Sequence, residues 1–406
     1  MPPSVRSLPS WLKLGAELRG RAEWWAGIGH EPGANDACYL HRLRLRAAVE
    51  PAAWLGIFLE AQDARALGLS RRAQAGVVNT LDLRLGYLEL GRMDRDPLAV
   101  RLGRQELRFG AERLVGTAGW GNVTRTFDAV RVAIRGGGLQ TDVFAAAVVH
   151  TVHGRFDRPR LQGGLYGVWL SSGRVLREAT LEPYLFWKTA PGVRGERGDM
   201  GDMDLWTAGI RASGRWRGGR LDYELETAVQ WGSAGSDAVR AWAGHWMAAV
   251  PLTSGSPSRL LVEYSFASGD RDRGDGRRGT FDQLYPSNHP FYGIADRIGW
   301  RNIHDVSGGL EWRPDRRWRL RLECHSFWLA DRRDALYTEA GVEFVRNPQA
   351  TSSRVGWELD FQAEWQYSEH LRLGVGWARF FSGPFLKQST PGGPFSYPYL
   401  LWEYRF

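Results

Sequence analysis

The sequence predicts an all-β protein, a transmembrane antiparallel β-barrel of about 18 strands with short periplasmic turns and long extracellular loops. Two observations predict this fold. Apolar and polar residues alternate in runs of about ten residues, as they do in strands with one apolar face. The chain also has 50 glycines and 20 tryptophans among its 406 residues. Because tryptophan and tyrosine favour membrane–water interfaces, this composition is typical of a barrel embedded in lipid.

The clearest alternation lies at residues 355–367. Every second residue from Val355 to Tyr367 is apolar or aromatic, whereas Glu358, Asp360 and their equivalents lie between them. Successive strand side chains point to opposite faces, so this strand has one apolar and one charged face. Similar runs place the predicted strands at 12–24, 39–49, 54–63, 81–90, 99–108, 128–134, 139–151, 161–171, 180–188, 205–216, 221–232, 239–251, 259–268, 303–313, 318–329, 355–367, 371–381 and 397–406.

The connections between these strands alternate in length, as they do in bacterial outer-membrane barrels. An even number of strands places both termini on the periplasmic side. We therefore expect residues 1–11 to form an N-terminal periplasmic segment and residues 12–406 to form a single barrel domain. The long connections, expected to be extracellular, are 64–80, 109–127, 189–204, 269–302, 330–354 and 382–396.

Several other classes of protein are disfavoured. No stretch approaches the ~18 unbroken apolar residues that a membrane helix needs. Cys38 and Cys324 are too few for a disulfide framework or a metal site. A soluble β-sandwich of this length would usually divide into domains, and no linker divides the chain. Phosphate-binding loops, nucleophile elbows and dinucleotide fingerprints are missing from the sequence, so we predict no enzyme and no cofactor.

The two ends of the chain give opposite indications. Residues 1–15 contain no apolar segment of the secretory type, although an outer-membrane protein needs one. We interpret the sequence as a mature form with an added Met, or as one whose start is misplaced. The last strand sets Leu400, Trp402, Tyr404 and Phe406 on one face and ends on an aromatic residue. This pattern resembles the signal read by the barrel-assembly machinery of Gram-negative outer membranes, which we expect as a partner.

The chain carries 53 basic and 45 acidic residues, a net charge of +8. If the apolar faces meet lipid, the charged faces line a lumen, and about 16–18 strands leave an aqueous channel. Arginine binds carboxylates through its planar fork, whereas interleaved acids keep that attraction weak enough for exit. Alternatively, the arginines mainly pair with lumen acids and stiffen the barrel. The residues predicted to face the lumen are Arg19, Arg21, Arg42, Arg44, Arg46, Arg84, Arg104, Arg131, Arg319, Arg321, Glu323, Glu358 and Asp360.

Four segments resemble the alginate-export outer-membrane proteins: 101–107 (RLGRQEL), 112–116 (ERLVG), 125–131 (RTFDAVR) and 279–289 (GTFDQLYPSNH), the last continuing through 291–293 (FYG), Asp296 and 299–302 (GWRN). The resemblance implies an 18-stranded, monomeric barrel that passes a polyuronate by diffusion through an electropositive constriction. It also carries over Arg104, Glu106 and Arg131 as lumen residues.

This sequence departs from the dedicated secretion channels in one respect. Those channels resemble one another in a long periplasmic turn near the C-terminus that plugs the pore. Here the corresponding turn, 367–370, is only a few residues long. The departure weakens the case for regulated polymer export and leaves a more general channel, including one for uptake, equally open.

The long loop at 269–302 contains aromatic residues that can stack on sugar rings or pack into the barrel mouth as a lid. We predict that Tyr285, His289, Tyr292 and Trp300 form a loop constriction. The same loop carries a weak calcium candidate, the carboxylates of Asp270, Asp272 and Asp275. Arginines interrupt this run and no bidentate Glu follows at the right distance, so we predict a solvated loop and no metal.

The sequence therefore favours an outer-membrane channel for anionic, alginate-like poly- or oligosaccharides. The alternatives are a general anion-selective porin, a barrel with a blocked lumen and, less favoured, a barrel-type enzyme such as a lipase or acyltransferase. Such an enzyme needs a Ser/His/acid group near the interface, and the sequence pattern indicates none. Nucleic acid is not an expected partner, because the arginines alternate with lipid-facing residues and form no exposed patch. The sequence does not indicate the direction of transport or the identity of the saccharide.

Overall fold

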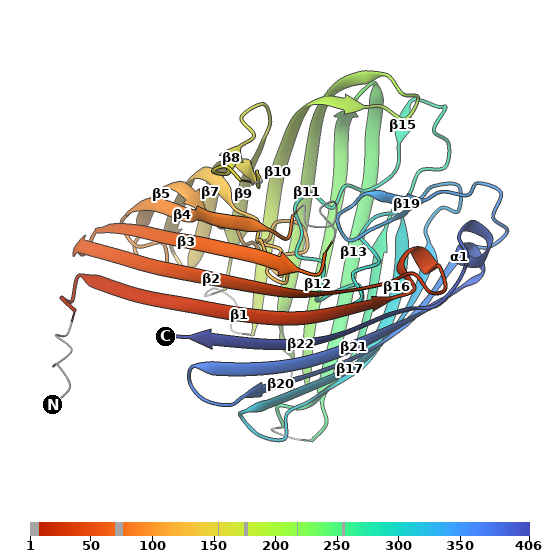
Figure 1. Ribbon diagram of the computed structural model, residues 1–406. Coiled ribbons are helices and arrows are strands. Elements are labelled where there is room, and N and C mark those ends of the chain that lie inside the picture. The colour runs from red at the N-terminus through yellow and green to blue at the C-terminus, as the bar shows by residue number, and fades with distance from the viewer. Residues whose placement is uncertain (1–7, 70–75, 153, 174–177, 217, 254–255) are drawn as a thin grey trace.

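The computed structural model is a closed antiparallel barrel of 18 strands, as the sequence predicts (Figure 1). It describes residues 8–69, 76–152, 154–173, 178–216, 218–253 and 256–406. The strands follow one another around the barrel in chain order, and the last, β22 (Phe395–Arg405), returns to pair with the first, β1 (Leu12–Ala26). Because the barrel is closed, none of its strands is left as an open edge.

All eighteen predicted strands have a counterpart in the barrel, and their ends differ by a few residues. The remaining barrel strands are β2 (Asn35–Ala52), β3 (Leu55–Leu67), β4 (Asn79–Leu90), β5 (Leu98–Gln105), β6 (Phe127–Gly136), β7 (Leu139–His150), β9 (Gly164–Ser171), β10 (Ala179–Arg194), β11 (Met200–Trp216), β12 (Leu221–Ala234), β13 (Asp237–Pro251), β14 (Arg259–Ala267), β16 (Ile303–Trp312), β17 (Trp318–Leu329), β20 (Arg354–Gln366) and β21 (Leu371–Ser382).

Six short elements lie in the connections: η1 (Ile28–His30), β8 (Arg158–Pro159), β15 (Arg277–Arg278), β18 (Leu336–Tyr337), β19 (Glu343–Val345) and α1 (Pro384–Ser389). In the described part of the chain, no helix is long and apolar enough to cross a membrane.

One expected long loop is wrong. The segment 189–204 is mostly strand, because β10 continues to Arg194 and β11 begins at Met200. Pro191 and Gly192 lie where the pairing register shifts, between Ala190 and Val193, and the ladder continues beyond them. A bulge of this kind absorbs residues that do not fit the regular ladder. The turn between β20 and β21 at 367–370 is short, as expected.

Aromatic side chains mark the two levels at which the barrel meets the membrane surface. On the extracellular side, neighbouring rings occupy paired positions on β9 to β12, with centroid distances of 4.9 Å for a tilted pair and 5.3 and 6.4 Å for two stacked pairs. We call this set the outer aromatic row; it comprises Tyr166, Trp187, Trp206 and Trp231. On the periplasmic side, Trp318 stacks on Trp365 at 5.4 Å. Interfacial aromatics of this kind bound the hydrocarbon-facing band of outer-membrane barrels.

Candidate pore and its lining

Two long connections enter the barrel and pair with each other inside it. The first inner loop, 106–126, joins β5 to β6, and the second inner loop, 268–302, joins β14 to β16. Val115 forms an isolated parallel bridge with Tyr285. The amide of Gly116 donates to the carbonyl of Tyr285, and the amide of Tyr285 donates to that of Leu114, each at 2.8 Å. The two loops therefore act as one insert across the lumen.

The first inner loop fills one half of the barrel with an apolar core. Phe109 packs against Phe144 of β7, Trp169 of β9 and Phe186 of β10, with ring centroids 5.0, 5.5 and 6.1 Å away. All four rings are buried. This part of the lumen is thus closed by side chains.

A buried charge fixes the same loop to the barrel wall. Arg113 donates to the Oε1 of Glu263 on β14 at 2.8 Å and lies 3.1 Å from the Nε2 of His245 on β13. Burial alone would lower the pKa of Arg113, but Glu263, Tyr292 and Glu224 outweigh it and raise that pKa above its usual value. The loop is held by a guanidinium that stays charged.

The second inner loop is held by carboxylates at both of its sides. Asp282 accepts hydrogen bonds from Lys188 of β10 at 2.9 and 3.0 Å. Burial raises the pKa of Asp282, but Lys188 and Arg301 lower it to about 2. At the other side, Glu358 and Asp360 of β20 accept the backbone amides of Ala295 and Ile294 at 2.9 and 3.1 Å.

A cavity of about 1,400 Å³ remains on the side of the barrel that the core does not fill. Its walls are β1 to β4, β17, β20 to β22 and the two inner loops. Its lining residues extend from Arg372 and Arg405 near the periplasmic strand ends to Ile28 and Asp36 at the extracellular side. Thirteen arginines and ten carboxylates line it. The cavity is the candidate pore, and its lining is net positive.

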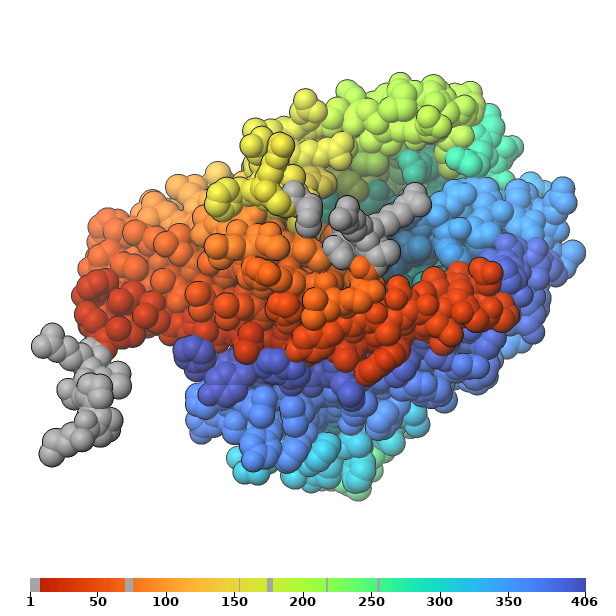
Figure 2. Space-filling model, in the orientation of Figure 1, coloured from red at the N-terminus to blue at the C-terminus, as the bar shows by residue number. Residues whose placement is uncertain are grey.

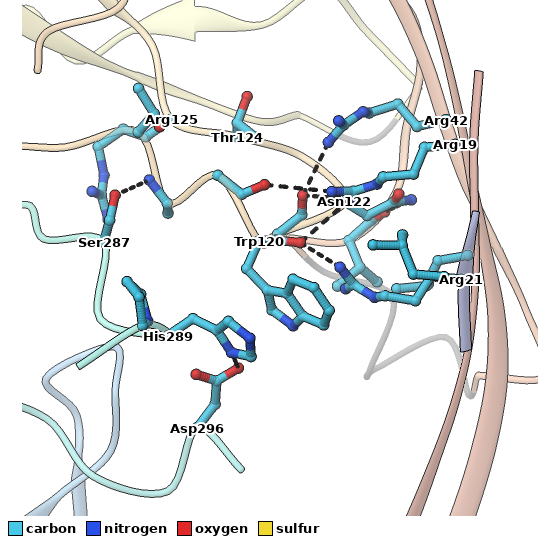
Figure 3. Close-up of a pocket in the computed structure, with 18 of the residues that line it drawn as sticks. Arg19, Arg21, Arg42, Trp120, Asn122, Thr124, Arg125, Ser287, His289 and Asp296 are labelled. Atoms are coloured by element: carbon cyan, nitrogen blue, oxygen red, sulfur yellow. Dashed lines mark hydrogen bonds and ion pairs between the residues drawn. The ribbon is translucent and has the colours of Figure 1, made fainter. Parts of the chain in front are cut away.

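Arginines of neighbouring strands hold the first inner loop against one wall of this cavity (Figure 3). Arg19 of β1 donates to the carbonyls of Gly119, Trp120 and Gly121 at 3.4, 3.3 and 2.8 Å. Arg21 donates to the carbonyl of Trp120 at 2.5 Å, and Arg42 of β2 donates to that of Gly121 at 3.2 Å. The three guanidinium groups therefore supply hydrogen bonds to the carbonyls of residues 119–121, which lie outside the strands.

Most arginines of the cavity also pair with a carboxylate. Arg42 donates to Glu17 at 2.5 Å, Arg46 contacts both Glu17 and Glu60, and Arg84 contacts Glu60 and Glu106. These contacts form one network across β1 to β4. At most of these positions the arginine therefore pairs with a lumen acid, which is the alternative that the sequence analysis gave.

Three cavity arginines differ, because no carboxylate of the described residues lies within 4.0 Å of them: Arg19, Arg125 and Arg297. Arg125 donates only to the carbonyls of Gly116 and Pro286, at 3.0 and 2.9 Å. Burial lowers the pKa of Arg125 to about 10, which keeps it charged at neutral pH. The guanidinium of Arg297 lies 5.2 Å from the ring centre of Phe344 and 4.8 Å from that of Phe395.

Sequence reasoning missed Arg125 and Arg297. Both lie on the inner loops, where no alternation indicates which side chains face the lumen. Arg125 falls inside a stretch that resembles alginate-export proteins, which was the available signal for it, whereas Arg297 lies outside these stretches.

An aromatic contact joins the two inner loops at the cavity (Figure 3). Trp120 stacks on His289 with ring centres 4.1 Å apart, and Arg21 of β1 lies 3.9 Å from the Trp120 ring centre. The Nε1 of Trp120 donates to the hydroxyl of Tyr397 at 3.3 Å, and His289 pairs with Asp296 at 2.9 Å. A continuous set of contacts thus runs from β1 through both loops.

The structure brings ten of the predicted site residues to the cavity: Arg19, Arg21, Arg42, Arg44, Arg46, Arg84, Glu106, Arg319, Arg321 and His289. It places three other predicted lumen residues away from it. Arg104 pairs with Asp128 at 2.8 Å near the end of β5, and Arg131 pairs with Asp142 at 2.8 Å in the filled half. Glu323 lies behind Arg321 and accepts its hydrogen bond at 2.5 Å.

The same correction applies to five further residues. Glu358 and Asp360 are buried under the second inner loop and bind its amides, so they do not line the cavity. Tyr285 forms the bridge between the loops, and Tyr292 and Trp300 are buried in the apolar core. Alternation identifies the inward face of a strand, but it does not show which inward positions a loop will cover. Of the four predicted loop residues, only His289 reaches the cavity.

The carboxylates of the weak calcium candidate are occupied by backbone amides. Asp270 accepts from Asp272, Asp272 accepts from Gly274, and Asp275 accepts from Arg277, at 2.7, 2.9 and 2.8 Å. Among the residues that the structure describes, no group of three or more His, Cys, Asp or Glu side chains could hold a metal ion.

The closed barrel, the inner loops and the charged cavity define a porin-like channel of the outer membrane of Gram-negative bacteria. Solved porins of Pseudomonas aeruginosa share the fold. OccK3 (OpdO) has a TM-score of 0.63 and 12% identity over 97% of this chain and 96% of its own. OpdK, solved with vanillate, has a TM-score of 0.63 and 12% identity over 97% and 98%. At these identities the likeness shows the fold alone. A search of curated proteins finds no match.

The family is shown by the sequence itself. The chain belongs to the Alginate export family, which matches residues 10–393. The resemblance noted in the sequence segments is thereby confirmed across nearly the whole chain.

Proposed function

We propose that this channel passes anionic saccharides of the uronate class by passive diffusion. The observation that carries the proposal is the lining of the cavity, in which thirteen arginines exceed ten carboxylates. Arg19, Arg125 and Arg297 provide positive charge, and no carboxylate in the described part of the chain pairs with them. A uronate carries one carboxylate on each sugar, so an extended chain presents a row of anions to these guanidinium groups.

The physical basis is a balance between attraction and release. Guanidinium groups lower the cost of moving a carboxylate from water into a narrow space, because they form charge-assisted hydrogen bonds with it. The carboxylates of Glu17, Glu60 and Glu106 compete for the same arginines. Each step is then weak enough for the solute to move on, as conduction requires. The cavity of about 1,400 Å³ exceeds an ordinary small-ligand pocket and accommodates an extended oligosaccharide.

A general anion-selective porin is the second candidate. Two observations favour it: the turn at 367–370 is short, and a porin of the same fold was solved with vanillate, a small carboxylate. We propose transport without catalysis, and ester hydrolysis by the pure barrel would contradict this. We also propose that the chain works as a monomer in contact with membrane lipid. The exposed Phe406 at its end would be read by the barrel-assembly machinery.

The test is single-channel recording of the refolded protein in a planar bilayer, with oligouronates or neutral oligosaccharides of equal length added. We expect anion-selective conductance that oligouronates block and neutral sugars do not. The triple variant R19Q/R125Q/R297Q should lose block and selectivity together. The matched control is Arg316→Gln, an exposed arginine on the periplasmic turn between β16 and β17.

The outcomes separate the candidates. Block by uronates and by small carboxylates at similar concentrations would favour the general porin. The absence of conductance would contradict both and indicate a sealed barrel.

A further inference from the structure

The segment 154–161, here called the rim loop, carries an unusual combination of exposed side chains outside the barrel wall. It connects β7 to β9, and β8 within it pairs with the end of β7. Phe156 and Leu161 are 71% and 81% exposed. Arg158 and Arg160 are exposed between them, and Arg155, which precedes Phe156, is exposed as well. Figure 2 shows this part of the chain, in yellow, standing out from the orange strands beside it.

The rim loop contains one carboxylate, and the structure turns it away from the arginines. Asp157 accepts hydrogen bonds from the amide of Val152 at 2.9 Å and from the side chain of Asn79 at 2.8 Å. Its own amide donates to Asp82 of β4 at 2.7 Å. Among the described residues, no carboxylate lies within 4.0 Å of Arg155, Arg158 or Arg160. The outer surface of the loop therefore presents apolar side chains next to positively charged ones.

The length of β9 indicates where the rim loop lies relative to the membrane surface. This strand has 8 residues, slightly fewer than the ~9–11 that cross a bilayer, so the barrel wall is low here. Tyr166 of β9 belongs to the outer aromatic row, which marks the membrane surface. Leu161 precedes Tyr166 closely in the chain, within about 17 Å even if fully extended. The rim loop thus lies at the level of the lipid headgroups of the outer leaflet.

We propose that the rim loop binds the phosphorylated headgroup of lipid A, the glycolipid of the outer leaflet of Gram-negative outer membranes. Arginine pairs with phosphate in a bidentate manner, and an exposed aromatic or aliphatic side chain at this level contacts the upper acyl chains. Arg158 and Arg160 would hold phosphate oxygens, and Phe156 and Leu161 would enter the boundary between headgroup and acyl chains. This site lies outside the barrel and does not depend on the function proposed for the cavity.

The experiment is native mass spectrometry of the purified full chain in neutral detergent, titrated with bisphosphorylated lipid A. We expect the double variant R158Q/R160Q to bind lipid A about tenfold more weakly, because hydrogen bonds to charged groups are lost. The matched control is R271Q/R273Q, which removes two exposed arginines from the second inner loop. A second variant, F156S/L161S, should weaken lipid A binding although Arg155, Arg158 and Arg160 all remain.

Two further probes, dephosphorylated lipid A and inorganic phosphate, identify the ligand. Dephosphorylated lipid A should bind as weakly to the wild type as lipid A binds to R158Q/R160Q, and inorganic phosphate should not displace lipid A. Wild-type affinity in R158Q/R160Q, or equal binding of dephosphorylated lipid A, would overturn the proposal. So would displacement by inorganic phosphate, which would indicate a site for a free anion. Heat-modifiable migration on gels verifies that each variant is a folded barrel.

Discussion

The indole of Trp120 and the imidazole of His289 lie parallel within 3°, with their ring centres 4.1 Å apart. This pair joins the first inner loop to the second at the edge of the cavity. Because Arg21 of β1 lies 3.9 Å from the same indole, the pair also connects both loops to the barrel wall. Together with the hydrogen bonds from Arg19 and Arg42 to the first inner loop, this contact positions the insert beside the cavity.

Replacing Trp120 with alanine should therefore widen the path. An aromatic pair is worth about 0.5–1.5 kcal/mol beyond its buried area, so its loss loosens the junction without unfolding the barrel. We expect single-channel conductance to rise by roughly twofold, since a wider constriction passes more hydrated ions. Trp318→Ala, which removes a stacked ring on the periplasmic side, is the control and should leave conductance unchanged. Equal conductance in W120A and wild type would contradict this role.

Arg297→Gln should weaken binding of oligouronates at the extracellular part of the cavity. The guanidinium lies near the rings of Phe344 and Phe395, and no carboxylate of the described residues pairs with it, so it is available to an anion in the cavity. We expect the concentration of oligouronate that halves the current to rise about tenfold, corresponding to one charge-assisted contact. Arg316→Gln should show no change. A similar rise with neutral oligosaccharides would point to a steric effect and not to charge.

Arg113→Met should destabilise the barrel, because it leaves Glu263 buried without its partner. Loss of one member of a buried ion pair costs about 3–5 kcal/mol. The double variant R113M/E263Q should recover a large part of this loss, since the uncompensated carboxylate is then removed as well. Urea unfolding followed by tryptophan fluorescence measures both. If the losses of the two single variants simply add in the double variant, the pair does not carry the stabilisation.

Selectivity should depend on pH near neutrality through Glu339, which lies between β18 and β19 and lines the cavity. Burial and the nearby Asp296 raise the pKa of Glu339 to about 7. Below pH 7 the carboxyl is neutral, and above pH 7 it adds a negative charge to the cavity. Anion selectivity, measured as a reversal potential in a salt gradient, should fall as pH rises from 6 to 8. Glu339→Gln should flatten this response, and an unchanged response would exclude Glu339 as its source.

The wall of the barrel could be predicted from sequence because each strand carries its own signal. A period of two identifies the inward positions, so Arg19 and Arg42 could be assigned to the lumen without a partner in view. The register supports this, because the two residues face each other across β1 and β2. The prediction of a loop at 189–204 was wrong for a local reason. Pro191 and Gly192 are residues typical of turns, but here they lie in a bulge, and the pairing of β10 with β11 continues past them.

The contents of the lumen could not be predicted in this way. Residues of the first inner loop have no periodicity, and their partners lie far away in the chain: Arg113 contacts residues 132 and 150 positions later. Such contacts depend on how the loop folds back into the barrel. For the same reason Glu358 could be placed on the inward face, but its role in binding the amide of Ala295 could not be foreseen.

The seam between β1 and β22 also governs how the protein can be made. Ala22 faces Leu400 across it, so the earliest strand to be synthesised has to wait for the last. A chain released before the final 11-residue strand has no partner for β1 and leaves two unsatisfied edges, which invite aggregation. Whatever escorts the unfolded chain across the periplasm must therefore protect both edges until β22 pairs with β1, and a chain that lacks β22 cannot close this barrel.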